Sequence, residues 1–136
     1  MTSLPSSSLM AVALGLAALL PATAALAQAG AACEPQSTQT EHRNACAVQR
    51  FQQADTAQNI LYADVMRALS AHERPELRKD QTAWSRQRTL RCKQRHTGDE
   101  SHPEWPRLLH DCLTEVTEAR RQALLHWLHT GSAPSR

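Results

Sequence analysis

The fold class is decided by residues 47–68, which read AVQRFQQADTAQNILYADVMRA. Seven positions in this stretch recur at alternating intervals of four and three residues: Ala47, Phe51, Ala54, Gln58, Leu61, Val65 and Ala68. Such intervals place side chains on one face of an α-helix, whereas a half-buried strand would alternate every second residue. The stretch therefore predicts an amphipathic helix, which we extend from Thr40 to Ser70.

A second segment shows the same spacing. It opens near Pro75, a residue favoured in the first turn of a helix, and is expected to end near Lys93. Its predicted inward positions are Leu77, Gln81, Trp84 and Arg88.

A third helix is expected to begin at Ser101. Glu104 follows three residues later, and Ser-x-x-Glu before an apolar run has the form of a capping box. The predicted buried face of this helix consists of Trp105, Leu109, Cys112, Val116, Ala119 and Ala123.

The connections between these helices, residues 71–74 and 94–100, are short, and short links make neighbouring helices antiparallel. The predicted fold is thus an all-α, up-down-up three-helix bundle. In this arrangement the start of the first helix, the end of the second and the start of the third meet at one end. All four cysteines are expected at that end.

The cysteines, Cys33, Cys46, Cys92 and Cys112, form an even set without C-x-x-C spacing. In an exported chain such a set favours two disulfides over a zinc or redox site. Four cysteines allow three connectivities. We favour the local one, Cys33 to Cys46 and Cys92 to Cys112, and the other two stay open at this stage.

The N-terminal residues have the pattern of a secretory signal peptide. Residues 9–20 are apolar and uncharged, and Ala25-Leu26-Ala27 has the small residues of a cleavage site. The run is too short to span a bilayer. We predict a signal peptide at residues 1–27, cleaved after Ala27 or, as second choice, Ala29. A helical domain at 28–130 and a disordered tail at 131–136 would follow, and the product would be periplasmic or secreted.

Charge and motifs exclude several classes of function. The chain has 15 Lys and Arg against 13 Asp and Glu, and a net charge of +2 is too small to indicate nucleic-acid or membrane-surface binding. No phosphate-binding loop or nucleophile motif occurs, so we expect no enzyme activity and no cofactor. His126 and His129 lie one helical turn apart, which leaves metal binding as a weak alternative to two solvated histidines.

An ordered set of residues carries a family resemblance. Its elements are Thr40-Glu41 with Asn44 and Cys46; Ala54-Asp55 with Asn59, Leu61 and Tyr62; Leu77 with Gln81, Trp84, Arg88 and Cys92; and Cys112-Leu113 with Thr117, Arg120 and Leu124. From Cys33 to about Leu125 the chain resembles the LprI-like lysozyme-inhibitor domain family. Gln58 departs from the pattern, since the family usually has Leu before the Asn of the first helix.

Several matching residues are polar although they fall near the predicted helix interfaces, where an unpaired polar group costs about 1–3 kcal/mol. We expect them to pair with one another as Asp55, Asn59, Gln81, Arg88, Thr117 and Arg120. Such a network would fix the register of the helices, and the alternative is a polar binding pocket between them.

The resemblance implies a periplasmic or secreted protein that inhibits lysozyme. In that case Lys93, Arg95 and His96 are the candidate partner-binding residues, because a Cys92–Cys112 disulfide would tether residues 93–103 and reduce the entropy lost on docking. The alternative is a non-inhibitory envelope module that binds or stabilises another periplasmic protein.

Overall fold

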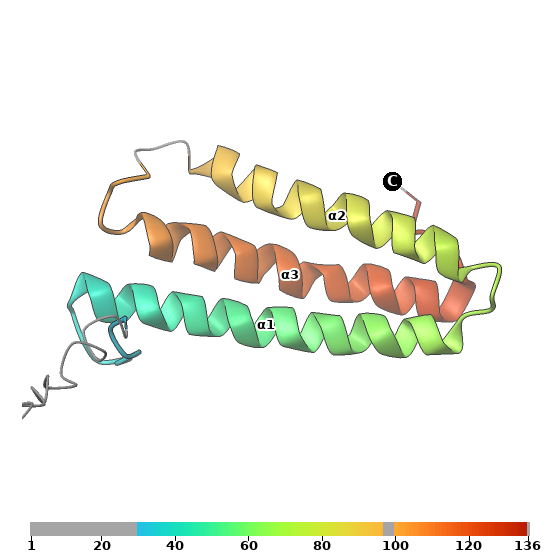
Figure 1. Ribbon diagram of the computed structural model, residues 1–136, viewed down its shortest axis with the longest axis horizontal. Coiled ribbons are helices and arrows are strands. Elements are labelled where there is room, and N and C mark those ends of the chain that lie inside the picture. The colour runs from blue at the N-terminus through green and yellow to red at the C-terminus, as the bar shows by residue number, and fades with distance from the viewer. Residues whose placement is uncertain (1–29, 97–99, 136) are drawn as a thin grey trace, which may run out of the picture.

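The computed structural model describes residues 30–96 and 100–135, so the predicted signal peptide and its cleavage near Ala27 lie outside the described residues. It contains three helices, α1 (Thr40–Ala68), α2 (Arg74–Arg95) and α3 (Trp105–Thr130), and the described residues include no strand. The helices run up-down-up, with α3 between α1 and α2 in Figure 1. The predicted all-α bundle is confirmed.

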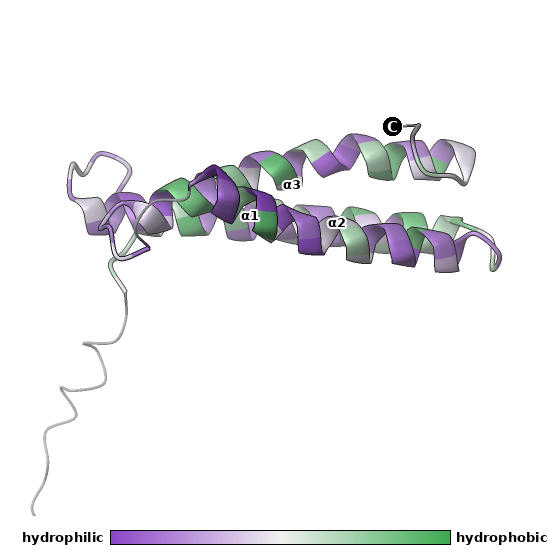
Figure 2. Cartoon of the chain, turned by 90° about the horizontal axis from the view of Figure 1, so that it is seen from above, coloured by the Kyte–Doolittle hydropathy of each residue, from purple (hydrophilic) through white to green (hydrophobic). Residues whose placement is uncertain are grey.

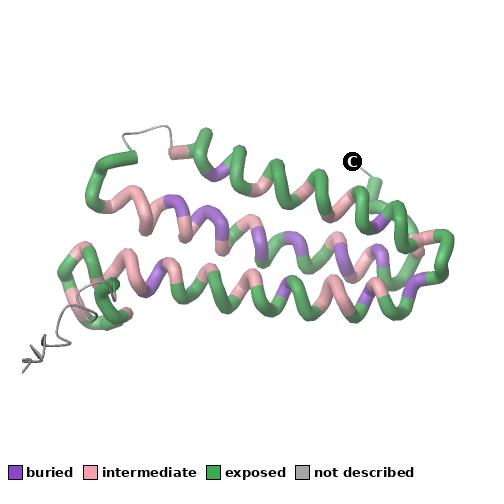
Figure 3. The backbone as a smooth tube through the Cα atoms, viewed as in Figure 1, coloured by how far each residue is buried: buried purple, intermediate pink, exposed green. Residues whose placement is uncertain are grey.

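The third helix is central to the packing. It contacts both other helices, and most extensively α1. In Figure 2 α1 and α2 overlap while α3 lies to one side, and apolar and polar residues alternate along each helix. Figure 3 shows buried positions most densely along α3. This follows because one helix that packs against two neighbours must bury a wider stripe of its surface.

We call the two ends of the bundle the stapled pole and the open pole. The stapled pole holds the start of α1, the end of α2 and the start of α3, together with the disulfides Cys33–Cys46 and Cys92–Cys112. The local connectivity is therefore confirmed. The open pole holds the other three helix ends.

Each pole has its own apolar cluster. At the stapled pole the buried cluster is Cys92, Leu109, Cys112 and Leu113. At the open pole it is Val65, Leu69, Leu77, Leu124 and Trp127. Between them lies a layer that contains three buried polar side chains, Gln58, Thr117 and Arg120. The core is thus two apolar clusters separated by a polar layer.

The predicted capping box at Ser101 is wrong. Helix α3 begins at Trp105, its N-cap is Glu104, and no side chain caps it. The carboxylate of Glu104 is bound by two arginines, Arg43 and Arg107, at 2.5 and 2.8 Å. Pro106 occupies the first turn of α3 instead.

The reciprocal hydrogen bonds of such a box occur instead in the turn before α2, although the N-cap of α2 is Glu73. The backbone N–H of Ser70 donates to Glu73 Oε2 at 2.8 Å, and the N–H of Glu73 donates to Ser70 Oγ at 3.3 Å. These are the two reciprocal hydrogen bonds of a capping box. They shape the link between α1 and α2, and α1 accordingly ends at Ala68, two residues earlier than predicted.

The predicted buried face of α3 is correct at Leu109 and Cys112 and wrong at its other positions, of which Trp105 is half-buried. Leu109 and Cys112 are buried, but Ala119 is exposed, and Val116 and Ala123 are only half-buried. The buried row continues instead through Leu113, Thr117, Arg120, Leu124 and Trp127. The row was missed because two of its members are polar, which an apolar-only pattern passes over.

At the open pole α3 ends on Gly131, which adopts a left-handed conformation with φ of 68°. Residues 132–135 beyond it are exposed and outside any helix. No helix in the two described ranges is long and apolar enough to cross a membrane.

Candidate functional site

The first part of the polar layer centres on Arg88 of α2. Its Nη1 donates hydrogen bonds to Asp55 Oδ1 at 2.6 Å and to Thr117 Oγ1 at 3.0 Å. Asn59, one turn from Asp55, donates to the second carboxylate oxygen at 3.1 Å. Arg88 therefore connects α2 to both other helices through charge-assisted hydrogen bonds.

The second part centres on Arg120 of α3, whose side chain is 6% exposed. Its Nε donates to Gln81 Oε1 at 3.0 Å, and its Nη2 donates to Asp80 Oδ2 at 2.6 Å. Trp127 Nε1 donates to the same Asp80 oxygen at 3.0 Å. One carboxylate of α2 thus holds two buried donors of α3.

The two parts meet at the indole of Trp84. The guanidinium carbon of Arg88 lies 4.9 Å from the centre of this ring, and that of Arg120 lies 5.3 Å from it. Arg88 also lies 5.3 Å from the ring centre of Phe51. Cation–π contacts of this kind are worth about 0.5–2 kcal/mol each. Trp84 therefore attracts two like charges that would otherwise only repel each other.

The structure brings the six predicted polar residues into two sets rather than one. Asp55, Asn59, Arg88 and Thr117 form the first, and Gln81 and Arg120 belong to the second. The sequence reasoning missed Asp80 and the indole N–H of Trp127. The sequence does contain a signal for Asp80. Two inward arginines call for two carboxylates, and Asp80 directly precedes the predicted inward residue Gln81. The mutual hydrogen bonds favour a role in fixing helix register over a binding pocket.

The predicted partner-binding residues lie at the stapled pole, at the end of α2. Lys93 is 3.9 Å from Glu100, and Arg95 Nη1 donates to Glu115 Oε2 at 2.8 Å, with all four side chains at least half exposed. His96 is the C-cap of α2. Ion pairs this exposed contribute only about 0–1 kcal/mol, so both cations can exchange partners at little cost.

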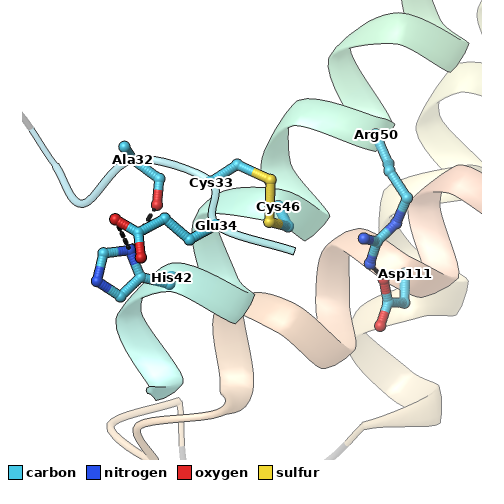
Figure 4. The surroundings of a disulfide bond; sticks show 7 residues. All are labelled: Ala32, Cys33, Glu34, His42, Cys46, Arg50 and Asp111. Carbon is cyan, nitrogen blue, oxygen red and sulfur yellow. Dashed lines mark hydrogen bonds and ion pairs between the residues drawn. A yellow bond between two sulfur atoms is a disulfide. The ribbon is translucent and has the colours of Figure 1, made fainter. Parts of the chain in front are cut away.

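The same pole carries a denser charge cluster around the first disulfide. Glu104 binds Arg43 and Arg107, and Arg50 Nη2 donates to Asp111 Oδ1 at 2.7 Å. The hydrogen bond from Arg107, helped by the charges of Arg107 and Arg43 and opposed by desolvation, lowers the pKa of Glu104. In Figure 4 Arg50 and Asp111 face each other beside the Cys33–Cys46 disulfide.

On the other side of that disulfide, the segment before α1 is held by His42. Its Nδ1 is 2.7 Å from the carbonyl oxygen of Ala32 and 3.7 Å from Glu34 Oε1 (Figure 4). Together with Cys33–Cys46, these contacts fix residues 32–34 against the first turns of α1.

Gln58 is the exception in the polar layer. It is 6% exposed, and its Nε2 is buried with no hydrogen-bond partner in the described structure. An unsatisfied buried amide costs about 1–3 kcal/mol. Gln58 also lines a groove between α1 and α3.

Metal binding gains no support from the described ranges, where no group of three or more His, Cys, Asp or Glu side chains could hold an ion. His126 and His129 lie in the last turns of α3, where His126 is half-buried and His129 exposed.

Comparison with known proteins gives one informative result. The family model described as "Lysozyme inhibitor LprI" matches residues 32–124, which include both disulfides and both arginine networks. No curated protein and no solved structure matches the chain. The matched range covers more than half of the sequence and all the contacts described above except those of Trp127 and the C-terminal turn. The chain therefore belongs to the LprI lysozyme inhibitor family.

Proposed function

We propose that this protein inhibits a lysozyme outside the cytoplasm by docking residues 93–103 of the stapled pole onto the enzyme. The observation that carries the proposal is the family match over residues 32–124. An oxidising compartment is supported by the two disulfides, which persist mainly in exported proteins. The signal peptide predicted at residues 1–27 fits the same location.

The geometry of the stapled pole suits this role. The Cys92–Cys112 disulfide fastens the end of α2, just before Lys93, to Cys112, which lies about two turns into α3. A segment tethered at both ends has fewer conformations to lose, so docking costs less entropy. The described parts of the proposed contact segment, residues 93–96 and 100–103, therefore lie next to elements that a covalent bond joins.

The chemistry of the segment also fits. Lysozymes hydrolyse peptidoglycan with two carboxyl groups that flank the scissile bond in a cleft. Lys93 and Arg95 can leave their exposed partners, Glu100 and Glu115, and donate charge-assisted hydrogen bonds to carboxylates in the cleft. His96 lies beside them at the helix end. With a net charge of +2 the protein gains no long-range steering towards a basic lysozyme, so we expect these short-range contacts to dominate.

The test is a turbidity assay of cell-wall lysis with the oxidised protein in molar excess over lysozyme. We expect slower lysis with the wild-type protein and normal lysis with the double variant Lys93→Glu, Arg95→Glu. The matched control is Arg78→Glu, Lys79→Glu, which reverses two exposed cations near the open end of the same helix. This control should inhibit as the wild type does.

Unchanged lysis with the wild-type protein would reject the inhibitor proposal for the lysozyme tested and favour a non-inhibitory envelope module. Inhibition that is equal for the wild type and both double variants would keep the function but move the docking surface elsewhere.

A further inference from the structure

The groove between α1 and α3 lies away from the proposed lysozyme-docking segment. It has a volume of about 480 Å³, and no residue of α2 lines it. Ala54 and Ala57 of α1 form part of its wall, and their small side chains leave space that larger residues would fill. Its position is the polar layer between the two apolar clusters, where Gln58 and Thr117 form part of the lining.

Gln58 gives this groove its chemical character. The side chain is buried, Nε2 has no partner among the described residues, and the residue belongs to the groove lining. An apolar side chain of similar size would avoid the cost of an unpaired amide at this position. A ligand that accepts a hydrogen bond from Gln58 would give the Nε2 donor the partner that it lacks.

Charged side chains flank the amide along the groove. Arg50 and Arg121 contribute two positive charges and Glu118 one negative charge. Arg121 is exposed and has no ion-pair partner within residues 30–96 and 100–135. Arg50 is paired with Asp111, but both side chains are about half exposed, so a ligand can replace that pair at little cost.

We propose that this groove binds a short, extended, acidic peptide segment of a partner protein. The Nε2 donor of Gln58, once turned to the groove, can bind a backbone carbonyl oxygen of the segment. From Arg50 to Leu61 the groove follows α1 for about 16 Å, the length of about five extended residues. Arg121 then pairs with an acidic side chain of the segment.

Binding requires one small movement. Nε2 is buried in the free protein, and rotation about the last side-chain torsion of Gln58 exchanges the positions of Nε2 and Oε1. That torsion is broad in glutamine, so the amide can turn its donor to the groove without rearranging the helix. The proposal is independent of lysozyme inhibition, because it uses a different surface.

The test is an NMR titration of the oxidised, ¹⁵N-labelled protein with the probe acetyl-Ala-Ala-Glu-Ala-Ala-amide and its Gln counterpart. We expect the side-chain amide signals of Gln58 and the backbone signals of Ala54 and Ala57 to shift. The Glu peptide should bind more tightly than the Gln peptide, because only the former pairs with Arg121.

Three variants separate binding from folding. Gln58→Leu should bind the Glu peptide about tenfold more weakly while its denaturant midpoint stays equal or rises. Arg121→Ala should bind both peptides equally. Arg78→Ala, an exposed arginine of α2 outside the groove, should bind as the wild type does.

Two results would overturn the proposal. One is the absence of any shift at Gln58 with either peptide. The other is a lower denaturant midpoint in Gln58→Leu, which would mean that the amide already stabilises the folded chain.

Discussion

The two poles of the bundle hold the same three helices together by different means. The stapled pole relies on two disulfides and on the Arg43–Glu104–Arg107 cluster. The open pole has no cysteine and relies on Val65, Leu69, Leu77, Leu124 and Trp127 packed together, with the capping box before α2. The stapled pole therefore combines covalent bonds with apolar packing, whereas the open pole depends on packing and hydrogen bonds.

This division has a functional consequence. The buried cluster at the stapled pole consists of two cysteines and two leucines, with Phe51, Trp105 and Val116 packed against it, and exposed charges surround it. The exposed cations Lys93 and Arg95 lie at that pole.

We expect the largest decrease in the free energy of unfolding when packing is lost at the open pole. Leu124 is fully buried, and Leu124→Ala should lower the free energy of unfolding by about 4 kcal/mol through lost burial and the cavity left behind. The matched variant is Leu109→Ala on the same helix, beside the Cys92–Cys112 disulfide, which should cost less. Urea unfolding measures both. Equal losses would mean that the disulfides do not relieve the stapled pole of its packing.

Removal of one disulfide comes next. Cys92→Ser with Cys112→Ser should destabilise the protein by about 3 kcal/mol, because a link across 20 residues no longer restricts the unfolded chain. Cys33→Ser with Cys46→Ser is the comparison, and it frees only the segment before α1. Hydrogen exchange should show faster opening of α2 and α3 at the stapled pole in the first pair alone. If the open pole also lost protection against hydrogen exchange, the two poles would not be stabilised independently.

A substitution where α3 meets the α1–α2 link should have a smaller effect on stability. Gly131 has a positive φ, and a Cβ there would lie 1.9 Å from Glu73 Oε1, on the carboxylate that Ser70 holds. Gly131→Ala should therefore cost about 1–2 kcal/mol through backbone strain and the displaced Glu73. Gly30→Ala is the control, because a Cβ at Gly30 meets nothing within 4 Å. If Gly131→Ala unfolded at the same temperature as the wild type, the α1–α2 link would be able to adjust to the new side chain without loss of stability.

The sequence was sufficient for the fold but not for every helix end. The spacing in residues 47–68 predicts α1 within two residues at each end, and short links with an even cysteine set predict the bundle and its disulfides. The start of α3 was misplaced because Ser-x-x-Glu occurs at Ser70 and at Ser101, and the tertiary contact with Arg43 decides the role of Glu104. A local pattern cannot indicate a partner 61 residues away.

The polar layer was predictable in part of its membership but not in its pairing. The polar positions followed from a family pattern, whereas the division into two sets depends on the side-chain directions of Arg88 and Arg120. Asp80 was missed because the sequence reasoning considered one carboxylate for both arginines. The state of Gln58 could not be predicted, since its missing partner is a property of the packed α1–α3 interface.

The smallest expected effect is on the pH dependence of stability, and it is tested with one carboxylate at each pole. Arginine contacts lower the pKa of Glu104, chiefly through the hydrogen bond from Arg107, and hydrogen bonds from Ser70 lower the pKa of Glu73. A lowered pKa in the folded state gives stability that is complete above the unfolded value of about 4.3 and is lost as the pH falls through the folded value. Glu104→Gln and Glu73→Gln should each be less stable at pH 7 and lose less on acidification.

Salt distinguishes the two poles in this experiment. Screening weakens the charges of Arg43 and Arg107 on Glu104, whereas the Ser70 donors that hold Glu73 are neutral. Between pH 7 and pH 3 the urea midpoint of the wild type should fall further than that of Glu104→Gln. We therefore expect 1 M NaCl to reduce this difference between the two proteins. The Glu73→Gln difference should change little. Equal salt sensitivity of the two variants would contradict the distinction, because it would mean that charge contributes no more at the stapled pole than at the open pole.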